Sequence, residues 1–299
     1  MWWFTNTETS RKRRKNALKL IKISVITDVH LRSNVDKDPL SLCAGDARKY
    51  YASHSNYRHF RDIVNSDNDA DLVLDLGDAL DASGACGSDG AFLSSIISTI
   101  TPNYRITIGN HDFDDKTYSD LVTLFGRDAE PEIGGSKFNE KIVLENGNAN
   151  IQLMLLDTNF IDNTHANTAR GDYHSDTLSW VTNELATPSS NNILFASHHL
   201  PHYYQHPSAW PYFQEAGALA FQAIIDNAVA NNPDLKISYI GGHHHTNSLI
   251  TYDNLGINLP GYRLPTSIQI EHGYKTTITI DRQGNINFAT QQLNYPYPD

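Results

Sequence analysis

Five short clusters of aspartate, histidine and asparagine are the part of this 299-residue chain best suited to chemistry. They are Asp28-Val29-His30, Gly77-Asp78-Ala79-Leu80-Asp81, Gly109-Asn110-His111-Asp112, His198-His199-Leu200-Pro201 and Gly241-Gly242-His243-His244-His245. Carboxylates, imidazoles and an amide oxygen form a mixed set of hard and borderline donors, which suits Mn²⁺, Fe or Zn²⁺ better than Ca²⁺. The clusters therefore predict a transition-metal site.

The spacing within two clusters fits side chains that hold one ion together. In an extended segment, residues i and i+2 point to the same side. Asp28 could therefore act with His30, and His243 with His245. Glycines at positions 77, 109, 241 and 242 would let the backbone turn tightly beside these ligands.

The elements that must position these clusters are short β-branched runs, typical of strands buried on both faces. The predicted strands are Lys22–Thr27, Asp71–Leu76, Arg105–Ile108, Ile151–Leu156, Asn192–Ser197 and Lys236–Ile240, and each cluster directly follows one of them. In an open α/β sheet, ligands bind at the carboxyl ends of the strands. We therefore expect the five clusters to converge.

Helical patterns separate several of these strands, over Ala47–Asn65, Ser175–Leu185 (with Ser175 as its expected cap) and Glu215–Ala230. Beyond residue 246 the pattern alternates, which predicts antiparallel strands over Ser267–Ile270, Lys275–Ile280 and Asn285–Phe288. The fold class is therefore α/β with extra antiparallel strands. We expect a flexible basic leader over residues 1–20 and a single domain over residues 21–299.

Composition excludes several classes of protein. The chain has 14 His but only 11 Lys, and a net charge of −11. Residues 1–22 hold seven Lys or Arg and one Glu, so the remainder, with 16 basic and 33 acidic residues, carries −17. This charge argues against a general nucleic-acid binder, and the short apolar runs exclude a membrane-spanning helix.

The N-terminus and the cysteines leave alternatives open. The run Arg11–Lys15 fits a solvated leader, with a nuclear address or a polyanion-binding arm as the alternatives. No signal peptide is visible, which favours a cytoplasmic location. The two cysteines, Cys43 and Cys86, follow strands that carry clusters and could meet there as a disulfide.

The motif order D-x-H, G-D-x-x-D, G-N-H-D, a histidine after a strand, and G-H-x-H resembles the calcineurin-like metallophosphoesterases, from Ile21 to about Phe288. This resemblance implies a four-layer α/β/β/α sandwich of two mixed sheets flanked by helices. It also implies two metal ions (Mn, Fe or Zn). One ion would be held by Asp28, His30, Asp78 and His245, and the other by Asp78, Asn110, His198 and His243.

The same resemblance implies roles for the remaining polar residues of the clusters. His111 would face the phosphate as the catalytic histidine, Asp112 would orient it, and Asp81 would accept a hydrogen bond from a ligand histidine. The family often has H-x-P at the fourth motif, and counting back from Pro201 selects His199 as the ligand. Counting forward from the strand end selects His198, which we prefer, with His199 supporting it.

The implied reaction is hydrolysis of a small phosphate ester. A hydroxide that bridges the metals would attack phosphorus, and His111 would assist the leaving group. A phosphodiesterase is the leading hypothesis and a phosphomonoesterase the alternative. A nuclease fits the acidic body less well, and a metal-binding scaffold without activity is the non-enzymatic alternative.

Substrate specificity would depend on the loops that border the metal site. The histidines expected to border the site include His165, His174, His202 and His206, whereas His54, His59 and His272 are expected to be ordinary surface residues.

Overall fold

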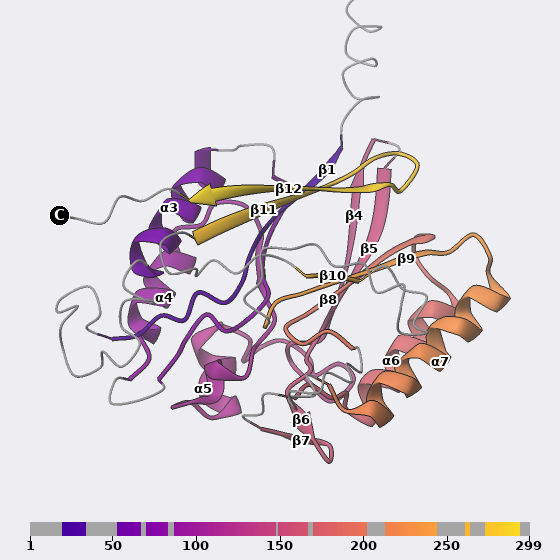
Figure 1. Cartoon of the computed structure of the whole chain (residues 1–299), viewed down its shortest axis with the longest axis horizontal. Coiled ribbons are helices and arrows are strands. Elements are labelled where there is room, and N and C mark those ends of the chain that lie inside the picture. Colours follow the sequence, from indigo (N-terminus) through magenta and orange to yellow (C-terminus); the bar gives the residue numbers. More distant parts are fainter. Residues whose placement is uncertain are drawn as a thin grey trace, which may run out of the picture.

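The computed structural model describes residues 20–33, 53–66, 70–82, 87–147, 149–166, 170–201, 213–243, 261–263 and 273–293. Two five-stranded mixed sheets dominate it (Figure 1). The first has the order β12-β11-β1-β2-β3, with β1 Ile21–Ile26, β2 Leu72–Asp75, β3 Tyr104–Ile106, β11 Gly273–Ile280 and β12 Ile286–Leu293. The second has the order β10-β9-β8-β5-β4, with β4 Glu140–Asn146, β5 Ala149–Leu156, β8 Asn192–Ser197, β9 Lys236–Gly241 and β10 Gly261–Arg263.

The remaining elements are short or lie outside the sheets. The strands β6 Phe160–Ile161 and β7 Thr164–His165 form a small hairpin. The helices are α3 Ser53–Ser66, α4 Gly90–Ile97, α5 Tyr118–Leu124, α6 Ser175–Ala186, α7 Glu215–Asn231 and the 3₁₀ helix η1 His111–Phe113. Among the described residues, no helix combines the length and apolarity needed to cross a bilayer.

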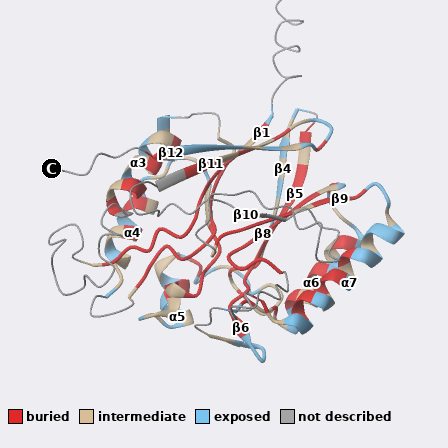
Figure 2. Cartoon of the chain, in the orientation of Figure 1, coloured by how far each residue is buried: buried red, intermediate tan, exposed pale blue. Residues whose placement is uncertain are grey.

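Three apolar clusters build the expected four layers. One lies between the sheets and takes alternate residues of β1, such as Ile21, Ile23 and Val25. A second joins the first sheet to α3, α4 and α5, and a third joins the second sheet to α6 and α7. Strands β1, β2, β5, β8 and β9 are buried along most of their length, whereas β4, β12 and the outer faces of α6 and α7 carry exposed residues (Figure 2). The prediction of a four-layer α/β/β/α sandwich is confirmed.

The parallel pairs β1–β2, β2–β3, β5–β8 and β8–β9 carry the site, because the segments after these strands leave the sheets at the same end. The six predicted buried strands are present, one of them (Asn192–Ser197) with the predicted bounds and the others with bounds shifted by at most two residues. The predicted strand Ser267–Ile270 and the start of the helix predicted over Ala47–Asn65 lie outside the described residues.

Two local expectations were wrong. His174, not Ser175, caps α6, because its Nδ1 accepts the Asp176 N–H at 3.1 Å. His54 is not a surface residue: it is 3% exposed, and its Nε2 lies 3.0 Å from the Asp89 carboxylate. Because α3 packs against α4, this histidine faces the interior.

Candidate metal centre

The loops after β1 and β2 are hydrogen-bonded to each other immediately beyond the sheet. The backbone N–H groups of Asp28 and His30 donate to the carbonyls of Gly77 and Asp78, at 2.9 and 2.8 Å. The second sheet joins the same region, because the backbone N–H of His243 donates to both Asp28 carboxylate oxygens, at 3.0 and 3.1 Å. Clusters from both sheets therefore meet, as the sequence predicts.

Four predicted ligands adopt a left-handed backbone conformation. Asp28, His30, Asp78 and His243 have φ of 53°, 53°, 52° and 71°. Among the described residues that are not glycine, the only others with positive φ lie in the β6–β7 turn. Such conformations cost about 1–3 kcal/mol each and gather at functional sites.

This backbone changes the explanation of the D-x-H spacing. We expected Asp28 and His30 to share a side because the segment is extended, but β1 ends at Ile26 and both residues are left-handed. Val29 between them points away as expected, into the apolar cluster against the helices. The local turns, not strand alternation, bring the two side chains together.

Two glycines permit the close approach of neighbouring loops. A Cβ on Gly109 would lie 2.2 Å from Asp78 Oδ1, and one on Gly242 would lie 2.1 Å from Thr27 Oγ1 and 2.6 Å from Asp28 Oδ2. A side chain at either position would therefore displace a carboxylate of the site.

Asp78 lies at the centre of the cluster and is 1% exposed. Its Oδ1 accepts the backbone N–H of His111 at 2.8 Å, and its Oδ2 lies 3.1 Å from His198 Nε2 and 3.8 Å from His30 Nε2. Burial alone would raise the pKa of this carboxyl, but the histidines around it outweigh burial and hold the pKa well below its usual range. Asp78 is therefore an anion between two histidines, one from each sheet.

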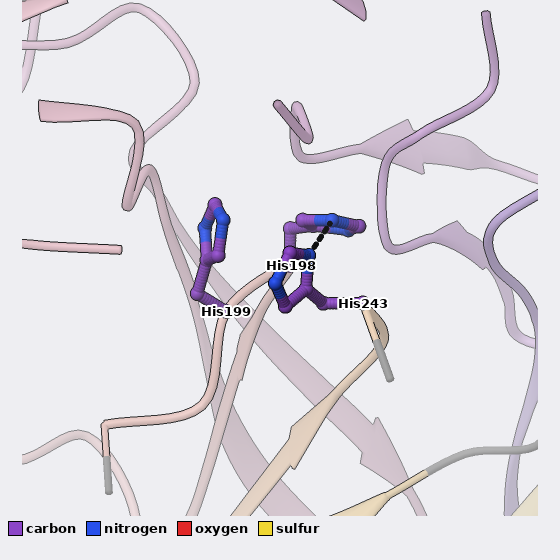
Figure 3. Close-up of side chains that lie close together, drawn as sticks. All are labelled: His198, His199 and His243. Carbon is purple, nitrogen blue, oxygen red and sulfur yellow. Dashed lines mark hydrogen bonds between the residues drawn. The ribbon is translucent and has the colours of Figure 1, made fainter. Parts of the chain in front are cut away.

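His198 is held so that Nε2 faces the cluster. Its Nδ1 lies 2.9 Å from the Leu76 carbonyl oxygen, and its Nε2 lies 3.2 Å from His243 Nδ1 (Figure 3). Imidazole nitrogens bind Zn²⁺ at about 2.0–2.1 Å, so two such ligands of one ion lie about 3 Å apart. The spacing of His198, His243 and Asp78 fits shared ligands of an ion.

Without an ion, His198 binds a proton tightly. Burial lowers its pKa, but the neighbouring Asp78 charge outweighs burial and raises the pKa to about 9. An ion that takes this site at neutral pH must therefore displace a proton.

His30 has the outer partner expected for a ligand. Its Nδ1 lies 3.1 Å from Asp81 Oδ2, and Arg32 Nη2 donates to that same oxygen at 2.7 Å. A carboxylate on one ring nitrogen leaves the other nitrogen to face an ion. The contact expected between Asp81 and a ligand histidine is present, with Arg32 added to it.

Asn110 has a buried side-chain oxygen that could bind a cation. Its side-chain oxygen is buried, and no group in the described part of the chain donates a hydrogen bond to it. A buried acceptor without a donor is costly, and a cation would satisfy it. Together with the carboxylates and imidazoles, this oxygen shows that the donor set fits divalent metal ions.

The expected contact between Asp112 and His111 is wrong. Asp112 accepts backbone N–H groups of Asp78, Leu80 and Gly109, at 3.0, 2.8 and 2.8 Å. It thereby holds the loops after β2 and β3 together. His111 Nδ1 instead lies 3.0 Å from Asp114 Oδ2. The 3₁₀ helix η1 explains why Asp114, and not Asp112, contacts His111, because side chains at i and i+3 lie above one another in that geometry.

The His111 side chain is 34% exposed, whereas Asp28, His30, Asp78, Asn110 and His198 are buried. Burial lowers its pKa, but the Asp114 hydrogen bond and the charges of Asp78 and Asp81 outweigh burial and raise the pKa to about 10. The ring is therefore an imidazolium at neutral pH. It also lies edge-on to His30, with ring centroids 4.9 Å apart.

Several predictions fall outside this geometry. His245, His202, His206 and His272 lie outside the described residues, as do Cys43 and Cys86, so neither the His245 ligand role nor the disulfide is tested. His165, expected to border the site, has Nε2 at 3.0 Å from Asp157 Oδ2 and stacks on Tyr118 at 3.6 Å between ring centroids. It anchors the β6–β7 hairpin.

Sequence reasoning missed Asp75, a fully buried carboxyl at the end of β2. Its Oδ2 accepts the Tyr57 and Tyr104 hydroxyls at 2.8 and 3.1 Å, and its Oδ1 accepts the Gly77 N–H at 3.1 Å. Burial raises the pKa of Asp75 to about 7 from 3.8. No spacing rule marks this residue, because it lies inside an apolar strand run.

We expect Asp75 to make the metal-free chain less stable as pH rises. Below about pH 4 Asp75 is protonated in both the folded and the unfolded chain. Between about pH 4 and pH 7 it stays protonated in the folded chain only, so rising pH favours the unfolded chain. The loss approaches about 4 kcal/mol by pH 8. Urea unfolding of the chelated protein across this range should show stability falling with pH, and Asp75→Asn should make that fall smaller by about 4 kcal/mol. Equal slopes in both proteins would contradict the assignment, with Asp115→Asn as the exposed control.

A scan against protein-family models matches residues 21–247 to the calcineurin-like phosphoesterases. The chain belongs to the calcineurin-like phosphoesterase family. The match covers the segments after β1, β2, β3, β8 and β9 and ends before β10. A search of curated proteins finds no match.

Solved structures show the same fold for this phosphoesterase. A dimetal phosphatase from Danio rerio has a TM-score of 0.61 at 14% identity, with 92% of this chain and 99% of that chain covered. A 5′-nucleotidase described as putative, from Staphylococcus aureus, gives 0.54 at 15% identity, covering 93% of this chain and 55% of that one. A purple acid phosphatase from yellow lupin gives 0.54 at 13% identity, covering 93% and 52%. The chain thus spans about half the length of the last two.

This phosphoesterase is a hydrolase of phosphoester bonds, and its family implies a dinuclear centre of divalent metal ions. The clusters described above are where such a centre fits, since donor atoms of Asp28, Asp78 and His198 lie within 4.8 Å of one another and His243 Nδ1 lies 3.2 Å from His198 Nε2.

Proposed function

We propose that the protein is a metal-dependent phosphodiesterase that hydrolyses a small phosphate ester, with His111 assisting the leaving group. The observation that supports this role is the His111–Asp114 contact at 3.0 Å, beside the candidate ligands and on the open side of the cluster. A histidine that is hydrogen-bonded to a carboxylate stays protonated and can donate a proton to the leaving oxygen as a general acid.

The ligand sets follow the family pattern. Asp28, His30, Asp78 and His245 would hold one ion, and Asp78, Asn110, His198 and His243 the other. Mn, Fe and Zn all suit these donors. When bound, such a pair activates water for attack on phosphorus and neutralises charge on the phosphoryl oxygens.

The chain's own residues supply orientation and protons. Asp112 fixes the relative position of the Asp78 and Asn110 loops through its three backbone hydrogen bonds. The Leu76 carbonyl and Asp81 orient His198 and His30. Asp114 fixes the His111 ring and holds its proton, so that Nε2 can donate to a leaving oxygen.

Charge favours a small diester over a phosphomonoester or a polyanion. Residues beyond 22 carry a net −17, and a diester brings one negative charge where a monoester brings up to two. A nucleic acid brings many more.

The test compares a chromogenic diester, bis(4-nitrophenyl) phosphate, with 4-nitrophenyl phosphate, each with Mn²⁺ and with chelator. We expect the diester to be preferred in kcat/KM and both activities to vanish on chelation. Preference for the monoester would establish the phosphomonoesterase alternative. Two transition-metal ions per chain are expected by elemental analysis, and protein that holds them but hydrolyses neither ester would favour the scaffold alternative.

A further inference from the structure

Two adjacent histidines at the end of β8 have different kinds of partner. His198 and His199 are both fully buried, and their rings stand nearly perpendicular, with centroids 4.8 Å apart. Each ring contacts a fixed oxygen through Nδ1. That oxygen is the Leu76 carbonyl for His198 and the Thr158 hydroxyl for His199. The two oxygens differ in whether they can donate a proton.

A carbonyl oxygen only accepts, so Nδ1 of His198 carries the proton in that 2.9 Å contact. In the neutral ring the lone pair is then on Nε2, which faces Asp78 and His243 at 3.1 and 3.2 Å. This is the tautomer that binds a metal ion through Nε2.

The Thr158 hydroxyl imposes the reverse arrangement on His199. Its oxygen accepts the backbone N–H of His199 at 3.3 Å and lies 3.0 Å from the His199 Nδ1. In the described part of the chain, these are the only hydrogen-bond contacts of this buried hydroxyl, so Nδ1 is the acceptor for its proton. A neutral ring that accepts at Nδ1 carries its proton on Nε2.

The position of Thr158 is itself fixed. The residues on either side are fully buried, and the Asp157 carboxylate accepts the Asn159 N–H at 3.0 Å. The Thr158 carbonyl accepts the Asp172 N–H at 3.0 Å. The hydroxyl is therefore presented to His199 by a rigid segment after β5.

We propose that Thr158 sets His199 as the Nε2–H tautomer, so that His199 donates a hydrogen bond to the phosphoryl group while its neighbour His198 binds metal. The His199 ring lies beside the proposed ligand His243, with 4.5 Å between the ring centroids, so a phosphoryl group bound at that metal would lie in the neighbourhood of His199 (Figure 3). A protonated Nε2 cannot be a metal ligand. The proposal rests on the phosphoesterase function, and it resolves the choice between His198 and His199.

The first test reads the tautomers directly. In ¹⁵N-labelled protein loaded with Zn²⁺, long-range ¹H–¹⁵N correlation spectra distinguish protonated from unprotonated ring nitrogens. We expect His199 to show an unprotonated Nδ1 and a protonated Nε2, and inorganic phosphate to shift that Nε2–H signal. Thr158→Val should change the His199 pattern. A protonated Nδ1 on His199 in the wild type, or a signal that phosphate leaves in place, would overturn the proposal.

The second test separates the two histidines by variant. His199→Gln should keep two Zn²⁺ per chain and bind inorganic phosphate about 10- to 100-fold more weakly, as expected for a lost hydrogen bond to an anion. His198→Gln should bind less than two Zn²⁺ per chain. His59→Gln on α3 is the matched control. Loss of zinc from His199→Gln, or unchanged phosphate affinity, would refute the assignment.

Neither test depends on the natural substrate. If bis(4-nitrophenyl) phosphate is not hydrolysed while the His199 Nε2–H signal responds to phosphate, the phosphodiesterase proposal fails and this one stands. If the diester is hydrolysed but phosphate leaves the His199 Nε2–H signal in place, only the proposed role of His199 is refuted.

Discussion

Asp78→Asn should remove metal binding and nearly all hydrolysis. The asparagine keeps Oδ1, which accepts the His111 N–H. It replaces the charged Oδ2, which now faces His198 and His30, with an uncharged NH₂ group. In the proposed centre this carboxylate would be a ligand of both ions, so neither ion would keep its ligand set in the variant. The loss should exceed the 10- to 100-fold cost of removing an outer partner of a metal ligand.

Metal content and kcat/KM measured on the same preparation check this prediction. Asp115→Asn is the matched control, because that carboxylate pairs with Ser88 and Lys116 outside the cluster. An Asp78→Asn protein that retains two ions and turns over bis(4-nitrophenyl) phosphate normally would remove the basis for the proposed ligand sets. Circular dichroism would show whether the variant is folded.

His111→Gln should keep both metals and slow turnover according to the leaving group. A general acid contributes about 10²- to 10⁴-fold, and most of that for leaving groups that cannot depart as anions. We therefore expect a small effect on a 4-nitrophenyl diester and a large one on an alkyl diester. Full activity of the variant on the alkyl diester would exclude the assigned role.

Asp114→Asn tests how His111 is held. Because Asp114 raises the pKa of His111, the asparagine should lower that pKa and move the alkaline loss of alkyl-diester hydrolysis to lower pH. In the wild type, where Asp114 raises the pKa of His111, this alkaline loss should lie at higher pH than in the variant. A wild-type pH profile in Asp114→Asn would show that the contact does not tune the acid.

The positions of the site residues follow from the sequence more readily than their conformations. Buried strand runs and the residues directly after them predict where Asp28, Asp78 and His198 lie, because parallel strands end at one edge of a sheet. The family pattern adds the ligand sets. The left-handed backbone at Asp28 and His30 has no such signal, because aspartate and histidine adopt it only when surrounding contacts impose it.

Side-chain partners were the least predictable feature. Nothing in the order His111-Asp112-Phe113-Asp114 favours the second carboxylate, and only the 3₁₀ turn brings Asp114 to His111. Asp75 and Thr158 were missed because their partners come from elements 18 or more residues away. Strand β4 also escaped prediction, because its segment EKIVLEN has only three apolar residues, in one run, and so lacks the apolar–polar alternation typical of an edge strand.

The two sheets contribute ligands to the same proposed centre, and this has a consequence for folding. Asp28, Asp78 and Asn110 follow strands of one sheet, whereas His198 and His243 follow strands of the other. An ion held by both groups would add a cross-link to the contacts that already join the two sheets at this end, such as the Asp28–His243 pair and the His198–Leu76 contact. Each ion would then bind the folded sandwich and not the unfolded chain, so its stabilising effect would grow with the logarithm of the free metal concentration once that exceeds the dissociation constant. The free metal concentration in a cell would thus affect the folding stability of the protein as well as its rate of hydrolysis.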